Sequence, residues 1–269
     1  MRSTTLRLGS RDVDVDDRPV VMGVLDVESP GVGGDLSLDD LVRRAGRLVD
    51  GGADLLDLEL VGRAVPEVDE ELDVVARAVE ALVARLDVPL SVAASGAAVA
   101  RAAFGAGAVM ANDRTGRGDA TYLAAVAECG ATLVAGPGGR VDSGPAEVVE
   151  DVRAALLERV GRARSAGIPA DRIVLDAGLG QGGPARRALA LLRASDRFVE
   201  LGYPVLLSAD DATFVGAVPG LEDGGGQVAA SLAAASLGTT LGCRVVRTRD
   251  VAVHHQVCAV LAAVNRASR

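Results

Sequence analysis

Three signals that decide the fold meet in one stretch of the sequence, Gly51-Gly52-Ala53-Asp54-Leu55-Leu56-Asp57-Leu58. Its glycines suit the end of a helix, because glycine readily adopts the left-handed conformation found there. The apolar residues that follow predict a buried strand. Asp57 ends the main apolar run, at a position where an acidic side chain needs a reason to be buried. The stretch therefore predicts a helix end, a buried strand and a polar group at the carboxyl end of that strand.

The same pattern recurs along the chain. After a first apolar run at 20–25, candidate strands begin near Ala53, Pro89, Ala108, Thr132, Arg172, Val205 and Arg244. Helical periodicity appears near 37–50, 69–86, 96–105, 119–129, 147–166, 185–200, 222–241 and 250–265. Eight strand–helix units predict one α/β domain, a single (β/α)8 TIM barrel over 19–269 that follows a polar N-terminal lead at 1–18. A doubly wound open sheet is the rival, and the regular count of eight argues against it.

Composition limits the classes of partner. The chain has 269 residues and a formal charge of −9, which argues against nucleic acid and anionic membranes as partners. Its 3 cysteines are widely spaced, so they predict neither a disulfide framework nor a metal site. The N-terminal residues resemble no signal peptide, and no apolar run approaches membrane-spanning length. These features predict a cytoplasmic protein with a small-molecule ligand.

Four polar residues stand where apolar runs end: Asp57, Asn112, Asp176 and Arg247. A barrel of this class builds its site from the carboxyl ends of its strands, so we expect all four to face one common mouth. Asp113, beside Asn112, should face the opposite side by strand alternation and have a structural role. The histidines at 254 and 255 are expected at the surface or at a helix end.

Short motifs follow the strand ends in a fixed order. They are Met22-Gly23-Val24-Leu25-Asp26-Val27 with Gly33-Gly34, the stretch 51–58, Ala106-Gly107-Ala108 through Asn112-Asp113, Leu175-Asp176-Ala177-Gly178-Leu179-Gly180, Leu201-Gly202-Tyr203-Pro204-Val205 with Thr213-Phe214-Val215-Gly216, and Arg247 with Asp250 and Val251. In order and spacing the chain resembles the dihydropteroate synthases, pterin-binding transferases of folate biosynthesis. The resemblance covers nearly the whole length.

The resemblance implies roles for the strand-end residues. It makes Asn112 and Asp176 contacts to the pterin edge, and Asp57 more loosely so. That edge presents neighbouring donors, which carboxylates and an amide carbonyl can accept. Arg247 is implied as an anion ligand, and Arg249 stands where the family carries His, where a guanidinium can also bind an oxyanion. Family members pair through their late helices, here about 185–265, which implies a homodimer.

The chain also departs from the family pattern at several motif positions. The third-strand Asp-Thr reads Ala93-Ala94, the sixth-strand loop has Gln181 and Gly183 for Phe and Lys, and the seventh-strand Ser-Arg-Lys reads Asp210-Asp211-Ala212. The first-strand Asn is Asp26, and Glu28-Ser29-Pro30-Gly31-Val32 replaces the loop after it. Every one of the 28 basic residues is an arginine, so no lysine can substitute.

We therefore predict a divergent paralogue, a candidate pseudoenzyme with a partly retained pterin-type pocket and little dihydropteroate synthase activity. One alternative is an enzyme that uses Asp57, Asn112 and Asp176 on another heterocyclic or amide-bearing substrate. Another is a non-catalytic paralogue that binds a ligand or a protein. No cofactor is certain, but Asp26 is a candidate ligand for Mg²⁺, since hard cations take oxygen ligands. Asp26 fits equally well as a residue that caps the following loop.

Overall fold

A computed structural model describes most of the chain. It covers residues 5–28, 37–61, 68–94, 96–113, 116, 118–138, 144, 147–179, 185–208 and 226–267. The sequence motifs that involve Gln181, Gly183, Asp210, Asp211 and Ala212, with the loop at 29–36, lie outside these residues.

Strands and helices alternate as the apolar periodicity predicts. The strands are β1 (Thr5–Leu8), β2 (Arg11–Asp14), β3 (Val20–Glu28), β4 (Leu55–Val61), β5 (Leu90–Val92), β6 (Met110–Asp113), β7 (Thr132–Ala135), β8 (Ile173–Asp176), β9 (Val205–Ser208) and β10 (Val245–Thr248). The helices are α1 (Leu38–Asp50), α2 (Val68–Val83), α3 (Ala97–Ala106), α4 (Ala120–Glu128), α5 (Val148–Ser165), α6 (Ala185–Arg193), α7 (Ser195–Val199), α8 (Gly226–Thr240) and α9 (Val251–Ala267), with a 3-10 turn at Ala170–Arg172.

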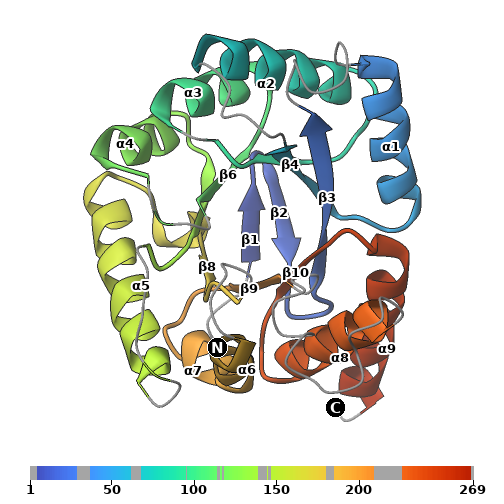
Figure 1. The fold of residues 1–269 in the computed structure, drawn as a ribbon, viewed down its shortest axis with the longest axis vertical. Helices are drawn as coiled ribbons and strands as arrows, with labels where there is room; N and C mark the ends of the chain where they lie inside the picture. Colours follow the sequence, from blue (N-terminus) through green and yellow to red (C-terminus); the bar gives the residue numbers. More distant parts are fainter. Residues whose placement is uncertain are drawn as a thin grey trace.

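Within the described residues, parallel strands close into a barrel in the order β10-β3-β4-β5-β6-β7-β8-β9. Figure 1 shows the helices as an outer ring around these strands. The barrel confirms the predicted (β/α)8 fold. Local signals hold as well: the Ser37 side chain accepts a hydrogen bond from the Asp40 N–H at 3.3 Å, and Gly107 ends α3 with φ 116°.

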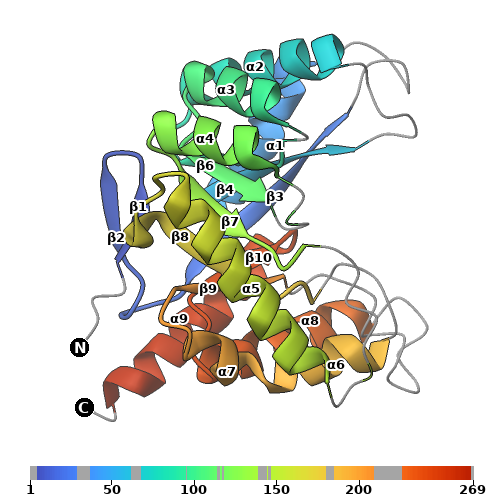
Figure 2. The ribbon, with the colours of Figure 1, turned by 90° about the vertical axis from the view of Figure 1, so that its left-hand side faces the viewer.

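An antiparallel hairpin of β1 and β2 covers one end of the barrel. Figure 2 shows it on the side where both chain termini lie. Its Leu6 and Leu8 are buried against barrel residues that include Met22 and Leu55. Residues 1–18 were predicted only as a polar lead, so this hairpin adds a structured cap that the sequence reading lacked.

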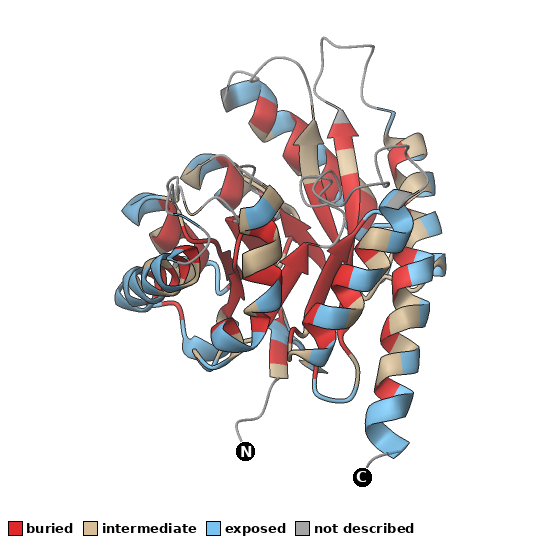
Figure 3. Cartoon of the chain, turned by 60° about the horizontal axis from the view of Figure 1, so that its bottom comes forward, coloured by how far each residue is buried: buried red, intermediate tan, exposed pale blue. Residues whose placement is uncertain are grey.

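Strand residues alternate between the barrel interior and the helical layer. Leu55, Met110 and Val174 belong to the interior cluster, while Leu56 and Leu58 pack with apolar residues of the helices. Figure 3 shows the consequence, buried strands inside helices that expose only their outer faces. Because the side-chain period of a strand is two, Asp57 follows Leu55 into the interior. No helix among the described residues is long and apolar enough to cross a membrane.

Candidate functional site

A buried polar network crosses the barrel interior above this apolar layer. Asp57 is fully buried and accepts hydrogen bonds from Ser91 Oγ at 2.7 Å, Asn112 Nδ2 at 2.7 Å and Arg247 Nε at 2.8 Å. These residues come from β4, β5, β6 and β10, so four strands contribute one side chain each. The network brings together Asp57, Asn112 and Arg247, three of the residues predicted for the mouth. It also gives Asp57 three donors from the protein itself.

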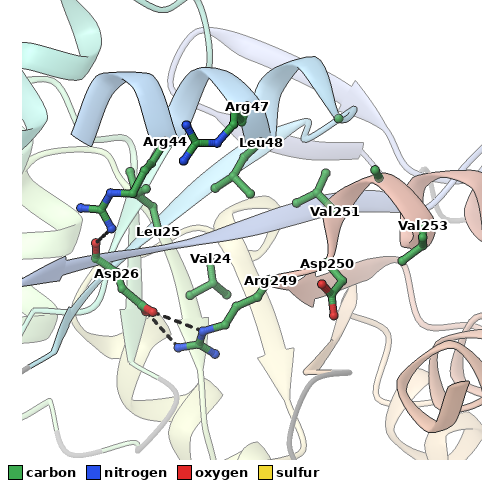
Figure 4. Close-up of a pocket in the computed structure, with 12 residues that line it drawn as sticks. Val24, Leu25, Asp26, Arg44, Arg47, Leu48, Arg249, Asp250, Val251 and Val253 are labelled. Carbon is green, nitrogen blue, oxygen red and sulfur yellow. Dashed lines mark hydrogen bonds and ion pairs between the residues drawn. The ribbon is translucent and has the colours of Figure 1, made fainter. Parts of the chain in front are cut away.

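A second group of charges lies next along β3 and β4. Asp26 and Glu59 are register partners on these strands, so their carboxylates stand side by side. Like charges in this arrangement repel each other unless a cation compensates. Arg249 supplies the cation: its Nη2 lies 2.9 Å from Asp26 Oδ1 and 3.2 Å from Glu59 Oε2. Figure 4 shows the guanidinium of Arg249 directed at Asp26.

Glu59 joins the two groups. Its Oε2 atom also lies 2.9 Å from Nη2 of Arg247. Burial opposes the charged form of Arg247, but the charges of Asp57 and Glu59 outweigh that cost and raise its pKa above the ordinary value. Three carboxylates, those of Asp57, Glu59 and Asp26, thus face two guanidinium groups. The predicted anion ligands are therefore held by acidic side chains of the chain itself.

Asn112 has one unused hydrogen-bonding atom. Its side chain is 4% exposed, and its Oδ1 has no hydrogen-bond partner among the described residues. The orientation of the amide follows from the network, because the Asp57 carboxylate can only accept and so must face the amide NH₂. A buried carbonyl without a donor costs about 1–3 kcal/mol. This atom is the clearest place for a ligand N–H group.

Asp176 ends β8 at the same end of the barrel. Its side chain is 1% exposed, and its Oδ1 accepts the Gly178 N–H at 2.7 Å. This bond ties the carboxylate to the loop that begins the next connection. Asp176 is therefore a buried acid held at the rim, and its role as a pterin contact stays a prediction.

Asp113 faces the opposite side of β6. It forms an ion pair with Arg159 of α5, and both side chains are buried. Arg159 also donates to the Gly118 carbonyl at 2.6 Å, and the Gly118 N–H donates to Asp113 Oδ2 at 3.0 Å. The predicted structural role of Asp113 is confirmed, since it fixes α5 and the loop before α4 to the barrel wall.

A pocket of about 460 Å³ opens beside the mouth, between α1 and α9. Asp26 and Arg249 line it together with Arg44, Arg47 and Val251 (Figure 4). Arg44 donates to the Asp26 carbonyl at 2.9 Å, which holds the β3 end against α1. The pocket reaches the rim charges but is not lined by Asp57, Asn112 or Asp176.

The described residues give limited support to a metal at Asp26. None of them form a group of three or more His, Cys, Asp or Glu side chains that could hold an ion. Both carboxylate oxygens of Asp26 face Arg249, at 2.9 and 3.4 Å, so a cation already compensates this acid. Binding of Mg²⁺ at Asp26 stays a prediction, and no chemical step is assigned to it.

Sequence reasoning missed two partners in the network. Glu59 and Ser91 were not predicted, although strand alternation from Asp57 places Glu59 on the same side. His254 was expected at the surface or at a helix end; it lies in the first turn of α9, but its side chain is fully buried and its Nδ1 lies 3.0 Å from Thr248 Oγ1. A buried helix face, which also carries Cys258, explains that position.

The fold and this mouth define a class of protein, a (β/α)8 barrel with a buried polar network at the carboxyl ends of its strands, the end at which barrels of this class build their sites. A family described as pterin binding enzyme matches residues 29–249, and the chain belongs to that family. The sequence is 32% identical over 247 residues to the dihydropteroate synthase of Bacillus subtilis, which covers 87% of this chain and 85% of that protein.

Two further comparisons agree. The probable bifunctional folylpolyglutamate synthase/dihydropteroate synthase of Haloferax volcanii is 35% identical over 258 residues, and this chain spans only 30% of its length. The solved structure of Xanthomonas albilineans dihydropteroate synthase in complex with 7,8-dihydropteroate superimposes with a TM-score of 0.84 at 35% identity. That alignment covers 97% of this chain and 98% of the other. The similarity therefore extends over the whole barrel.

Proposed function

We propose that the barrel mouth binds a pterin-type heterocycle, with Asn112 and Asp176 as contacts to its donor-rich edge. The observation that carries the proposal is the buried Oδ1 of Asn112, which lacks a donor among the described residues. Asp57 holds the amide NH₂, so the amide cannot turn to satisfy this atom internally. An N–H group of a pterin ring would supply the missing donor. Asp57 itself acts as a positioning residue in this proposal.

The comparisons support the ligand class. The Xanthomonas albilineans relative is described with 7,8-dihydropteroate, and a Thermus thermophilus dihydropteroate synthase at 34% identity is described in complex with 6HMPPP. Transfer of a pterin ligand to this chain rests on the shared fold and on Asn112 and Asp176 at matching strand ends.

We further propose that the chain has little dihydropteroate synthase activity. In the family reaction, p-aminobenzoate attacks the methylene carbon of a dihydropterin pyrophosphate and pyrophosphate leaves. An enzyme accelerates that step by positioning the two reactants and by placing positively charged groups beside the leaving pyrophosphate. Here Arg247 and Arg249 are engaged by carboxylates, and the sequence contains no lysine. Ala93 also stands where the family carries an acid, which leaves part of the pterin edge unpaired.

Authentic dihydropteroate synthesis is the second candidate. Full-length similarity to proteins of that name favours it, because ligand-binding residues and fold are inherited together. The two candidates share the pterin pocket and differ in the fate of the pyrophosphate. The anion side of the mouth therefore decides between them.

Pairing of two copies through α8 and α9 is part of the proposal, as is a cytoplasmic location. These helices pack side by side (Figure 1), and neither carries a charged residue before Arg266. Their exposed side chains include Val228, Leu237, Val260 and Val264. Apolar side chains exposed on two uncharged helix segments are suited to contact with a second copy. Light scattering of the purified chain measures its oligomeric state.

Calorimetry with an uncharged dihydropterin alcohol tests the ligand proposal. We expect measurable binding, and a loss of about tenfold in Asp176→Asn, since a charge-assisted hydrogen bond contributes about 1.5–3 kcal/mol. Asparagine keeps an acceptor for the Gly178 N–H, so the fold should be retained. Asp171→Asn removes the same charge from a half-exposed position at the other barrel end and is the matched control. Absence of binding by the native protein, or equal affinity in both variants, would overturn the proposal.

A further inference from the structure

The rim of the mouth contains an anion of its own. The Oε2 atom of Glu59 lies 2.9 Å from Arg247 and 3.2 Å from Arg249, where it contacts an Nη2 atom of each. Two guanidinium groups that converge on one oxygen form the arrangement expected for a bound oxyanion. The carboxylate of Glu59, a side chain of β4, therefore occupies the position that a bound oxyanion would take.

Register explains why this contact forms. Glu59 pairs with Asp26 across β3 and β4, and Arg249 lies between their carboxylates. Arg247 in turn lies between Glu59 and the fully buried Asp57. Each arginine thus bridges two acids. An external anion that took one guanidinium would leave an acid facing a like charge, and such a loss of compensation is costly.

Exposure differs among the residues of this cluster. The Asp57 side chain is 0% exposed and Arg247 3%, whereas Glu59 is 27%, Asp26 36% and Arg249 48% exposed. The Asp26 carboxylate pairs with Arg249, whereas Glu59 contacts both guanidinium groups, so Glu59 is the partly exposed acid whose turn toward solvent would release both. Asp57 would remain as the permanent partner of Arg247.

We propose that Glu59 is a specificity-determining residue that acts as an internal counter-anion and keeps the Arg247–Arg249 pair closed to external phosphates. The substrate class that follows is a ligand without a phosphate or pyrophosphate group at this position. The inference extends the proposed function but does not depend on pterin binding, because it concerns only the anion side of the mouth.

Calorimetry with inorganic pyrophosphate, in the absence of divalent cations, tests the proposal. Glu59→Gln keeps the length of the side chain and removes its charge. We expect this variant to bind pyrophosphate at least about tenfold more tightly than the native protein, since one charge-assisted contact corresponds to about 1.5–3 kcal/mol. Glu128→Gln is the matched control, because Glu128 pairs with Arg101 on the helical surface and its loss changes the net charge equally.

The double variant Glu59→Gln with Arg249→Gln should lose the gain, because one of the two guanidinium groups is then missing. Equal pyrophosphate affinity in Glu59→Gln and Glu128→Gln, or a gain that survives in the double variant, would overturn the proposal. If Glu59→Gln does not fold, Glu59→Ala serves the same purpose: it removes the carboxylate from both guanidinium groups, so this variant should bind pyrophosphate more tightly than the native protein. Native affinity in Glu59→Ala would then refute the inference. Pyrophosphate contains no pterin ring, so this assay tests the role of Glu59 even if the protein does not bind a pterin.

Discussion

Replacing Arg247 by methionine tests the buried network. Methionine matches the aliphatic stem of arginine, so the variant removes the guanidinium and keeps the packing of the stem. Asp57 is then left fully buried with only the Ser91 hydroxyl and the Asn112 amide as donors. Removing one partner of a buried ion pair costs about 3–5 kcal/mol, because the remaining charge is uncompensated. We expect the free energy of unfolding to fall by about that amount.

Urea unfolding followed by far-UV circular dichroism is the suitable assay, since the chain has no tryptophan. Arg101→Met is the control: it breaks the pair with Glu128, in which the two side chains are 46% and 60% exposed. Exposed pairs contribute only about 0–1 kcal/mol. The double variant Asp57→Asn with Arg247→Met should recover much of the loss, because a neutral pair replaces a lone charge. Equal destabilisation by Arg247→Met and Arg101→Met would refute the reasoning.

Three further outcomes follow from the same geometry. Ala93 lies two residues after Ser91, so strand alternation directs it toward the mouth. Ala93→Asp should tighten binding of the dihydropterin alcohol about tenfold in calorimetry, and unchanged affinity would contradict this prediction. Asp113→Ala should lower the free energy of unfolding by about 3–5 kcal/mol while pterin affinity stays unchanged, because its partner Arg159 is buried outside the barrel. With a thiol reagent at pH near 8, the exposed Cys129 should react in the folded protein, whereas Cys243 and Cys258 should not. Burial raises the pKa of Cys243 to about 12 and that of Cys258 to about 11, which keeps both thiols protonated at this pH. Rapid reaction of all three cysteines would contradict this prediction.

Local patterns were sufficient for the barrel. Each strand is a short apolar run and each helix has its own period and cap, so the elements could be placed without knowledge of their partners. The helix expected at 69–86 is found at Val68–Val83, and the one expected at 250–265 at Val251–Ala267. The region expected as one helix at 185–200 is two, α6 and α7, which meet at Ala194.

Long-range partners explain what could not be predicted. Leu6 and Leu8 alternate with polar residues in a strand of four, and only the barrel floor shows why they are buried. Glu59 follows Asp57 by two residues, but the arginines that bind it lie about 190 residues later in the chain. Closure of the barrel between β10 and β3 brings them together. A strand-end rule can therefore locate the mouth, while the pairing of its charges needs the structure.

Dihydropteroate formation by the purified protein measures whether carboxylates block the two arginines of the mouth. Dihydropterin pyrophosphate and p-aminobenzoate are incubated with the native chain, with Glu59→Gln and with the control Glu128→Gln, and product is separated by chromatography. We expect the native chain and Glu128→Gln to form negligible dihydropteroate, although both bind the pterin alcohol, because carboxylates hold the two arginines that would stabilise the leaving pyrophosphate. Robust, protein-dependent formation of dihydropteroate by the native chain would contradict this expectation.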